Sequence, residues 1–209
     1  RASLLGLACS ALGETDAQDG QGAIVAEHGS TCTETLAGTR ILNLASLWAG
    51  PLCSNLLGRM GANVTKYESS TRPDGGRSEQ RFFQALHAGQ RFITSDLTTP
   101  DGLESLRAEI DRAGIIIEGS RPRALEQLGI SASDEVQRGK IWVSITAHGR
   151  SGTNANRIGY GDDCAVAGGL VGDVNGRPTF LADAIADPLT GLVATDAILA
   201  ALQTGRASL

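Results

Sequence analysis

Short apolar runs alternate with stretches of helical periodicity in the middle of the chain. An apolar run at residues 41–44 is followed by Gly50-Pro51 and by apolar residues at helical spacing as far as Gly61, a residue type that often ends helices. A second strand is expected at residues 63–67, directly after this helix. Strand, helix and strand in such short succession predict a βαβ unit, in which the two strands run parallel and the connection is right-handed.

The alternation continues along the chain. We expect a strand at residues 91–95 and then a helix that Thr99 caps, that Pro100 begins and that carries its apolar residues on one face. Residues 115–117 and 141–145 are short apolar runs, as expected for strands of a parallel sheet that helices cover on both faces. The predicted fold class is therefore α/β, with a Rossmann-like open parallel sheet flanked by helices.

The two ends of the chain differ from its middle. Residues 13–37 are rich in small and polar residues without periodicity, so we predict a poorly structured N-terminal appendage or linker over residues 1–37 and the α/β domain over residues 38–209. Near the other end, Asn175-Gly176 predicts a turn and residues 188–203 a helix. The chain starts with arginine, and its one methionine lies inside the chain, which indicates a fragment of a longer protein.

The composition is typical of a globular protein that binds a small molecule. Of its 209 residues 41% are apolar, and the net charge is −5 with scattered basic residues, which disfavours nucleic acid and acidic membrane surfaces as partners. Cys9, Cys32, Cys53 and Cys164 form no CxxC pair or Cys/His cluster, so neither a disulfide framework nor a metal site is expected. With no leader pattern and no apolar run of membrane-spanning length, the sequence predicts a cytoplasmic protein.

A dinucleotide site is one hypothesis for such a sheet. Glu68, at the end of the second predicted strand, could hold a ribose hydroxyl. However, the turn after the first strand, residues 45–51, contains no GxGxxG sequence that would bring the backbone against a pyrophosphate, and the chain contains no Walker A sequence. The pattern therefore disfavours NAD binding and phosphate-loop chemistry, and the fold alone names no function.

A series of short segments, taken in chain order, points to a known family. The first segment, residues 36–51, consists of Leu-x-Gly, a predicted strand and Ala-Gly-Pro. The second, residues 61–68, reads Gly-Ala-x-Val-x-Lys-x-Glu. The others are Asp-Gly…Arg at 74–77, Ala-Gly-Gln-Arg at 88–91 followed by residues 96–102, Glu-Gly-Ser-Arg-Pro at 118–122, Ser-Ile-Thr-Ala-His-Gly at 144–149 and Ala-Asp-Pro-Leu-Thr-Gly at 186–191. Together these segments resemble the CaiB/BaiF, or class III, coenzyme A transferases. Gly119-Ser120 replaces the family's Asn-aromatic pair, and Arg123 replaces its glycine.

The resemblance implies an enzyme that moves coenzyme A from an acyl-CoA thioester to a carboxylic acid. Asp187 takes the place of the family's catalytic aspartate, which forms a mixed anhydride with the acyl group and then a thioester with coenzyme A. Acyl-CoA is thus a substrate, and neither a permanently bound cofactor nor a metal is implied. Full-length members form homodimers and carry a C-terminal small domain and a glycine-rich loop, and we expect this chain to be a fragment without these two parts. The residues that match coenzyme contacts are Trp48, Ala49, Ser69, Ser95, Thr98, Gly119, Ser120, Arg121 and Tyr160.

The residues around Asp187 suggest how its carboxylate is kept ionised. Because Asp187 precedes Pro188, we expect Asp187 at the N-cap of a helix, where unpaired N–H groups and the helix dipole favour the anion by about 0.3–1 kcal/mol and lower its pKa. The same pattern is typical of purely structural caps. Gly191 follows Asp187 at the family's spacing, whereas Asp183 has no glycine at that spacing and is expected to be a solvated or hydrogen-bonding neighbour.

Two other functions remain as alternatives. The α-methylacyl-CoA racemases share the family's fold and resemble one another in a His-Asp dipeptide before the aspartate segment, where the histidine acts as a base. Here that stretch, residues 159–163, reads Gly-Tyr-Gly-Asp-Asp, and no histidine follows His148, which disfavours racemisation. The second alternative is a non-catalytic fragment that binds coenzyme A.

Overall fold

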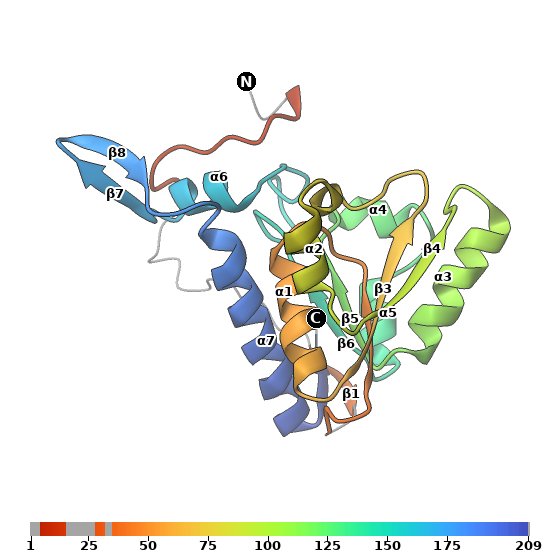
Figure 1. Cartoon of the computed structure of the whole chain (residues 1–209). Coiled ribbons are helices and arrows are strands. Elements are labelled where there is room, and N and C mark those ends of the chain that lie inside the picture. The colour runs from red at the N-terminus through yellow and green to blue at the C-terminus, as the bar shows by residue number, and fades with distance from the viewer. Residues whose placement is uncertain (1–4, 16–27, 32–34, 209) are drawn as a thin grey trace.

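A five-stranded parallel sheet forms the centre of the computed structural model, which describes residues 5–15, 28–31 and 35–208 (Figure 1). The strands lie in the order β4-β3-β2-β5-β6. From β2 the chain adds strands on one side as far as β4, and then returns to add β5 and β6 on the other side. The Rossmann-like sheet and its five predicted strands are confirmed. Their bounds are β2 Arg40–Asn43, β3 Asn63–Ser69, β4 Arg91–Ser95, β5 Ile115–Glu118 and β6 Ile141–Ser144.

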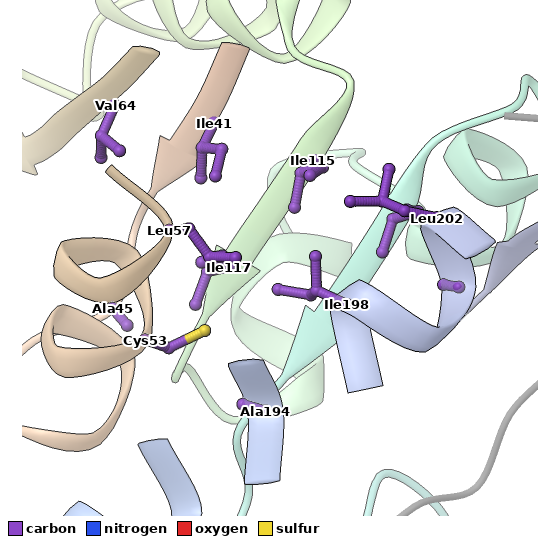
Figure 2. Packing of buried hydrophobic residues seen from close by; sticks show 12 residues of the cluster. Ile41, Ala45, Cys53, Leu57, Val64, Ile115, Ile117, Ala194, Ile198 and Leu202 are labelled. Carbon is purple, nitrogen blue, oxygen red and sulfur yellow. The ribbon is translucent and has the colours of Figure 1, made fainter. Parts of the chain in front are cut away.

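Helices cover both faces of the sheet, which explains why the central strand β5 is buried at every position. Successive residues of β5 alternate between two cores: Ile115 and Ile117 belong to one cluster, and Ile116 belongs to the other. Figure 2 shows the first cluster, in which Ile198 of α7 lies against the strands. The helices of this face are α1 (Ala49–Arg59) and α7 (Ala186–Thr204), and those of the opposite face are α3 (Pro100–Arg112) and α5 (Ala132–Gln137).

Predicted boundaries are confirmed where they depend on local residue types. The hydroxyl of Thr99 caps α3 by accepting the backbone N–H of Gly102 at 3.1 Å. After α1, Gly61 has a φ of 106°, which glycine adopts at little cost. Asn175 and Gly176 have φ values of 55° and 76°, and they form the predicted turn in a hairpin of β7 (Val171–Val174) and β8 (Arg177–Phe180).

Several short elements have no clear signal in the sequence. The hairpin of β7 and β8 projects away from the sheet beyond α6 in Figure 1. Among these elements, helix α6 is the most important for the candidate site, because its first residues contact the segment that leads into α7. The elements without a signal are strands β1 (His28–Thr31), β7, β8 and β9 (Arg206–Ser208), the 3₁₀ helix Gly75–Ser78, and helices α2 (Gln80–Leu86), α4 (Pro122–Glu126), α5 and α6 (Gly161–Ala167).

Part of the N-terminal appendage contacts the α/β domain. The backbone N–H groups of Gly13 and Thr15 donate to two carbonyls near the end of α6, each at 3.0 Å. Arg157 donates to the carboxylate of Glu14 and to the carbonyl of Cys9. Much of the predicted appendage lies outside the described residues, so the domain boundary at residue 37 stays a prediction.

Candidate active site

The carboxyl ends of β2 and β5 lie side by side where the strand order reverses. Ligands of open parallel sheets commonly bind at this position, because the loops of the two strands lead in opposite directions. The loop after β2 ends at Trp48, Ala49 begins α1, and the loop after β5 contains Gly119 and Ser120. A side-chain carbon on Gly119 would lie 3.6 Å from the Cβ of Ala45, so the two loops are in contact. The reversal therefore brings together four residues that the resemblance assigned to coenzyme A.

A buried ion pair holds the turn between β2 and α1. The Nζ of Lys66 lies 2.9 Å from the Oδ2 of Asp74, and their side chains are 1% and 0% exposed. Lys66 also donates to the carbonyl of Ala45, and the Oδ1 of Asp74 accepts the backbone N–H of Leu47 at 3.0 Å. Leu47 has a φ of 68°, in the left-handed region that costs a residue with a side chain about 1–2 kcal/mol. The pair therefore fixes the strained turn that presents Trp48.

Helix α7 approaches α1 closely at Gly191. A side-chain carbon at this position would lie 2.8 Å from the carbonyl oxygen of Ala49 and 3.1 Å from Leu52. The two helices lie side by side in Figure 1 and begin at the same edge of the sheet. Asp187 lies about one helical turn before Gly191, so the contact of Gly191 with α1 fixes the position of the helix that carries Asp187. The glycine four residues after the aspartate is thus a packing requirement.

Replacing Gly191 by alanine is expected to force α7 away from α1. The added carbon would overlap the carbonyl of Ala49, and the repacking should lower the free energy of unfolding by about 1–3 kcal/mol. Urea unfolding at neutral pH measures this change. Gly168→Ala is the matched control, because its added carbon would lie 3.4 Å from its nearest neighbour, the carbonyl of Cys164. Equal stability of Gly191→Ala and the unmodified chain would contradict the close approach.

Asp187 is not the N-cap residue that the sequence predicted. Helix α7 begins at Ala186, and Ile185 before it already has helical φ and ψ values of −55° and −27°. Asp187 is therefore the second helical residue, and its N–H donates to the carbonyl of Ala184 at 2.8 Å. Proline is tolerated in the first turn because N–H groups there have no partner within the helix. Pro188 thus indicates the first turn of the helix and not its first residue.

The pKa of Asp187 is raised, so the predicted low pKa is wrong. Burial of the carboxyl, and then the negative charges of Asp162, Asp163 and Asp183, raise its pKa from 3.8 to about 6. The start of a helix favours the anion by only about 0.3–1 kcal/mol, which is less than one pKa unit. Burial and like charges therefore outweigh the helix dipole. Asp183 is exposed, as predicted, and acts on Asp187 through its charge.

Asparagine at position 187 is expected to stabilise the fold at neutral pH. The pKa of Asp187 is about 6 in the folded chain, against an ordinary value of 3.8 that applies to the unfolded chain. At a pH between these two values, the carboxyl is protonated only in the folded chain. The side chain therefore lowers stability as the pH rises from about 4 to about 6, and this cost persists above pH 6. We expect Asp187→Asn to raise the melting temperature at pH 7.5 by roughly 2–4 °C. The difference should disappear below about pH 4, and a lower melting temperature at pH 7.5 would contradict the unfavourable charge.

Most of the remaining residues assigned by the resemblance lie along the same edge of the sheet. Ser69 and Ser95 end β3 and β4 and are paired in register. Thr98 lies in the turn after β4, Arg121 directly precedes α4, and Tyr160 precedes α6 with 55% of its surface exposed. Ser69, Ser95, Thr98 and Arg121 therefore lie at the candidate edge, where they are spread along several strands, and Tyr160 lies at the start of α6.

Several charged residues at this edge were not predicted to contribute. Glu118 ends β5 with 1% exposure, and its carboxylate accepts the backbone N–H of Ser120 at 2.7 Å and a guanidinium N–H of Arg150 at 3.2 Å. Glu68, the candidate ribose ligand, is held by Arg77 through two hydrogen bonds of 3.0 Å. Lys66 and Glu118 stand in segments that carry the resemblance, but nothing in those segments indicates burial or pairing.

The described residues contain neither a metal-ligand cluster nor a membrane-spanning helix. Within residues 5–15, 28–31 and 35–208, no three His, Cys, Asp or Glu side chains are grouped so that they could hold a metal ion. Among the same residues, no helix combines the length and the apolar character needed to cross a membrane. A cavity of about 590 Å³ lies at the amino ends of the strands, between Arg40, Arg91 and Arg112. It opens at the opposite edge of the sheet from Asp187, so we do not include it in the candidate site.

The fold and the site define an α/β protein with a half-buried aspartate at the carboxyl edge of a parallel sheet. The sequence model of CoA-transferase family III matches residues 36–208 of the chain. The chain therefore belongs to CoA-transferase family III, and the family predicted from its ordered segments is confirmed.

Two curated relatives and one solved structure show the extent of the similarity. Succinate–glutarate CoA-transferase of Agrobacterium fabrum is 33% identical over 188 residues, which cover 80% of this chain and 46% of the relative. The succinyl-CoA–L-malate CoA-transferase beta subunit of Chloroflexus aurantiacus is 32% identical over 199 residues, or 85% and 48% of the two chains. A crystal structure of a CaiB/BaiF family protein from Brucella suis has a TM-score of 0.75 and 29% identity, covering 84% and 50%. The chain thus spans about half the length of these relatives.

Proposed function

We propose that this chain is the aspartate-bearing part of an enzyme that transfers coenzyme A from an acyl-CoA thioester to a carboxylic acid, with Asp187 as the nucleophile. The observation that carries the proposal is the place of Asp187: a half-buried carboxyl with a pKa of about 6, one helical turn before Gly191, which packs against Ala49 where the strand order reverses. At neutral pH this group is ionised, and its raised basicity makes it a better nucleophile than an ordinary aspartate. Membership of CoA-transferase family III supports the reaction type.

Four bond exchanges complete the proposed reaction. The Asp187 carboxylate attacks the thioester carbonyl, the C–S bond breaks, and coenzyme A leaves as a thiolate while an aspartyl-acyl anhydride forms. The thiolate then attacks the Asp187 carbonyl of the anhydride, which releases the donor acid and forms an aspartyl thioester. The acceptor carboxylate displaces the thiolate again to form a second anhydride. The thiolate finally attacks the acceptor's carbonyl, which frees Asp187 and yields the new acyl-CoA without net proton uptake.

The loops around Asp187 would hold the coenzyme during these steps. Trp48 and Ala49 after β2, and Gly119 and Ser120 after β5, lie at the position where ligands of open parallel sheets bind. Ala49 is also the first residue of α1, where backbone N–H groups have no partner within the helix and favour negative charge. We propose that these loops bind acyl-CoA and that Ser69, Ser95, Thr98, Arg121 and Tyr160 extend the contact along the edge.

Trapping with hydroxylamine tests the proposed nucleophile. Hydroxylamine converts an aspartyl anhydride or thioester into a hydroxamate, which mass spectrometry locates in the peptide that contains Asp187. Succinyl-CoA is the first donor to test, with glutarate and malate as acceptors, because the names of two relatives contain these acids. We expect modification of Asp187 only when donor is present, and Asp183→Asn should be modified normally. Full-length protein that exchanges no coenzyme A and carries no modification at Asp187 would overturn the proposal.

The surroundings of Asp187 weigh against the racemase alternative. A side chain at Gly161 would lie 2.7 Å from Ala184, which leaves no room for a histidine at the start of α6. The Nε2 of His148 is buried without a hydrogen-bond partner in the described part of the chain, so it is not open to a substrate. We expect no uptake of solvent deuterium at the α-carbon of a bound acyl-CoA. Uptake without coenzyme A exchange would favour racemisation, and a protein that binds acyl-CoA without either reaction would be a binding fragment.

We also propose that the full-length protein is a cytoplasmic homodimer, as the family resemblance and the composition predicted. Light scattering on the eluting full-length protein should give twice the mass of one chain. A monomer with full transferase activity would contradict the proposed dimer. Recovery of the protein outside the cytoplasmic fraction would contradict the proposed location.

A further inference from the structure

The helix that carries Asp187 begins directly after a strained turn. Ala184, three residues earlier, has a φ of 44°, in the left-handed region that alanine rarely adopts. The carbonyl of Ala184 accepts the N–H of Asp187 at 2.8 Å, so the conformation of Ala184 sets where the first turn of α7 starts. Ile185 between them is already helical. A conformation of this kind persists only where neighbouring structure holds it.

Two consecutive residues of α6 hold Ala184. The Oδ1 of Asp162 accepts the backbone N–H of Ala184 at 2.9 Å. Gly161 packs against the same residue so closely that a side-chain carbon there would lie 2.7 Å from both its Cβ and its carbonyl oxygen. Asp162 is half-buried, and an N–H group left unpaired in such a place is costly. The start of α6 is therefore the support for the start of α7.

We propose that Asp162 is the positioning residue of the catalytic carboxylate: by holding the backbone N–H of Ala184, it fixes the turn that places Asp187. This inference rests on the proposed function, in which Asp187 is the nucleophile. Asp162 contacts the backbone of Ala184, and it acts on the reaction only through the place and the charge environment of Asp187.

Asp162 also acts on Asp187 through its charge. Burial, and then the charges of Asp162, Asp163 and Asp183, raise the pKa of Asp187 to about 6. The titratable groups that face Asp187 are Asp162, Asp163 and the Cys164 thiol from α6 and Asp183 from the preceding loop, while the first turns of α1 carry no charged side chain. A variant that keeps the hydrogen bond and removes the charge therefore separates the two effects.

Two substitutions at position 162 separate position from charge. Asp162→Asn keeps an oxygen acceptor for Ala184, so most of kcat should remain while the acid limb of the kcat/KM profile moves to lower pH. Asp162→Ala removes the acceptor, and kcat should fall about 10- to 100-fold, as expected when a reacting group is misplaced. The KM for acyl-CoA should change less than about threefold. The measurement is coenzyme A transfer by the full-length protein between pH 5 and pH 9.

Ala184→Gly provides a matched rescue. Glycine adopts a positive φ without strain, so Asp162→Ala combined with Ala184→Gly should recover about tenfold of the lost kcat. If Asp162→Ala alone does not fold, this double variant should fold, because its turn no longer needs the hydrogen bond. Asp183→Asn removes a facing charge without touching Ala184, so it should shift the acid limb and keep kcat. Full kcat in Asp162→Ala, or an equal loss in Asp162→Asn, would overturn the positioning role.

Failure of this inference can be told apart from failure of the proposed function. If the unmodified protein gives no hydroxamate at Asp187, the nucleophile is wrong and the positioning role falls with it. If Asp187 is modified at the same rate in the unmodified protein and in Asp162→Ala, the proposed function stands and the positioning role is wrong.

Discussion

Replacing Asp187 by asparagine is expected to lower the rate of coenzyme A transfer by at least about a thousandfold. The amide has nearly the shape of the carboxylate but is a poor nucleophile, and losing a covalent nucleophile typically costs this much or more. Acyl-CoA should still bind with similar affinity, because the loops after β2 and β5 are unchanged. The measurements are the initial rate of acyl exchange and the dissociation constant for the donor. Asp187→Ala should give the same loss and excludes recovery by slow deamidation of the asparagine.

Asp183→Asn is the matched control for this experiment. Asp183 lies four residues before Asp187 and is exposed. Its replacement removes one charge that raises the pKa of Asp187, so the rate should change only a few-fold. A loss of activity in Asp183→Asn that equals the loss in Asp187→Asn would contradict the assignment. The combination of lost activity and raised melting temperature in Asp187→Asn would mark a residue kept for function at a cost in stability.

The sheet could be predicted because its strands carry their signal locally. Residues 115–117 are apolar at every position, since one face packs under α1 and α7 and the other under α3 and α5. Helix α6, in contrast, consists of small and acidic residues, Gly161–Ala167, without an apolar stripe at helical spacing. Contacts with the N-terminal segment and with the start of α7 stabilise it, and such contacts between distant residues leave no periodic pattern.

Some features of the candidate site could also be predicted from local sequence. The ordered segments place Asp187, and Gly191 at the family's spacing is explained by its contact with Ala49. The prediction of a low pKa was wrong because the local pattern shows only a helix start, whereas burial of the carboxyl and the like charges of Asp162 and Asp163 on a separate helix raise the pKa. Local sequence therefore places the proposed nucleophile, and tertiary contacts decide its protonation.

Replacing Lys66 by methionine is expected to destabilise the fold by about 3–5 kcal/mol, because it leaves the buried carboxylate of Asp74 without its partner. Burial opposes the ionisation of Asp74, but the charge of Lys66 and the N–H groups of Leu47 and Gly76 together keep its pKa below the ordinary value. The stability that Asp74 contributes is therefore present at neutral pH and is lost as the pH falls through this lowered pKa. Urea unfolding at pH 7.5 measures the change.

The double variant Lys66→Met/Asp74→Asn tests whether the cost comes from the unpaired charge. Asparagine keeps an oxygen that accepts the N–H of Leu47, so the double variant should recover most of the loss caused by Lys66→Met. If the double variant is as unstable as the sum of the single variants, the two side chains are not coupled.

Because the pair also holds the turn that presents Trp48, Lys66→Met should raise the KM for acyl-CoA more than it lowers kcat. An unchanged KM would show that the pair supports the fold without shaping the coenzyme site.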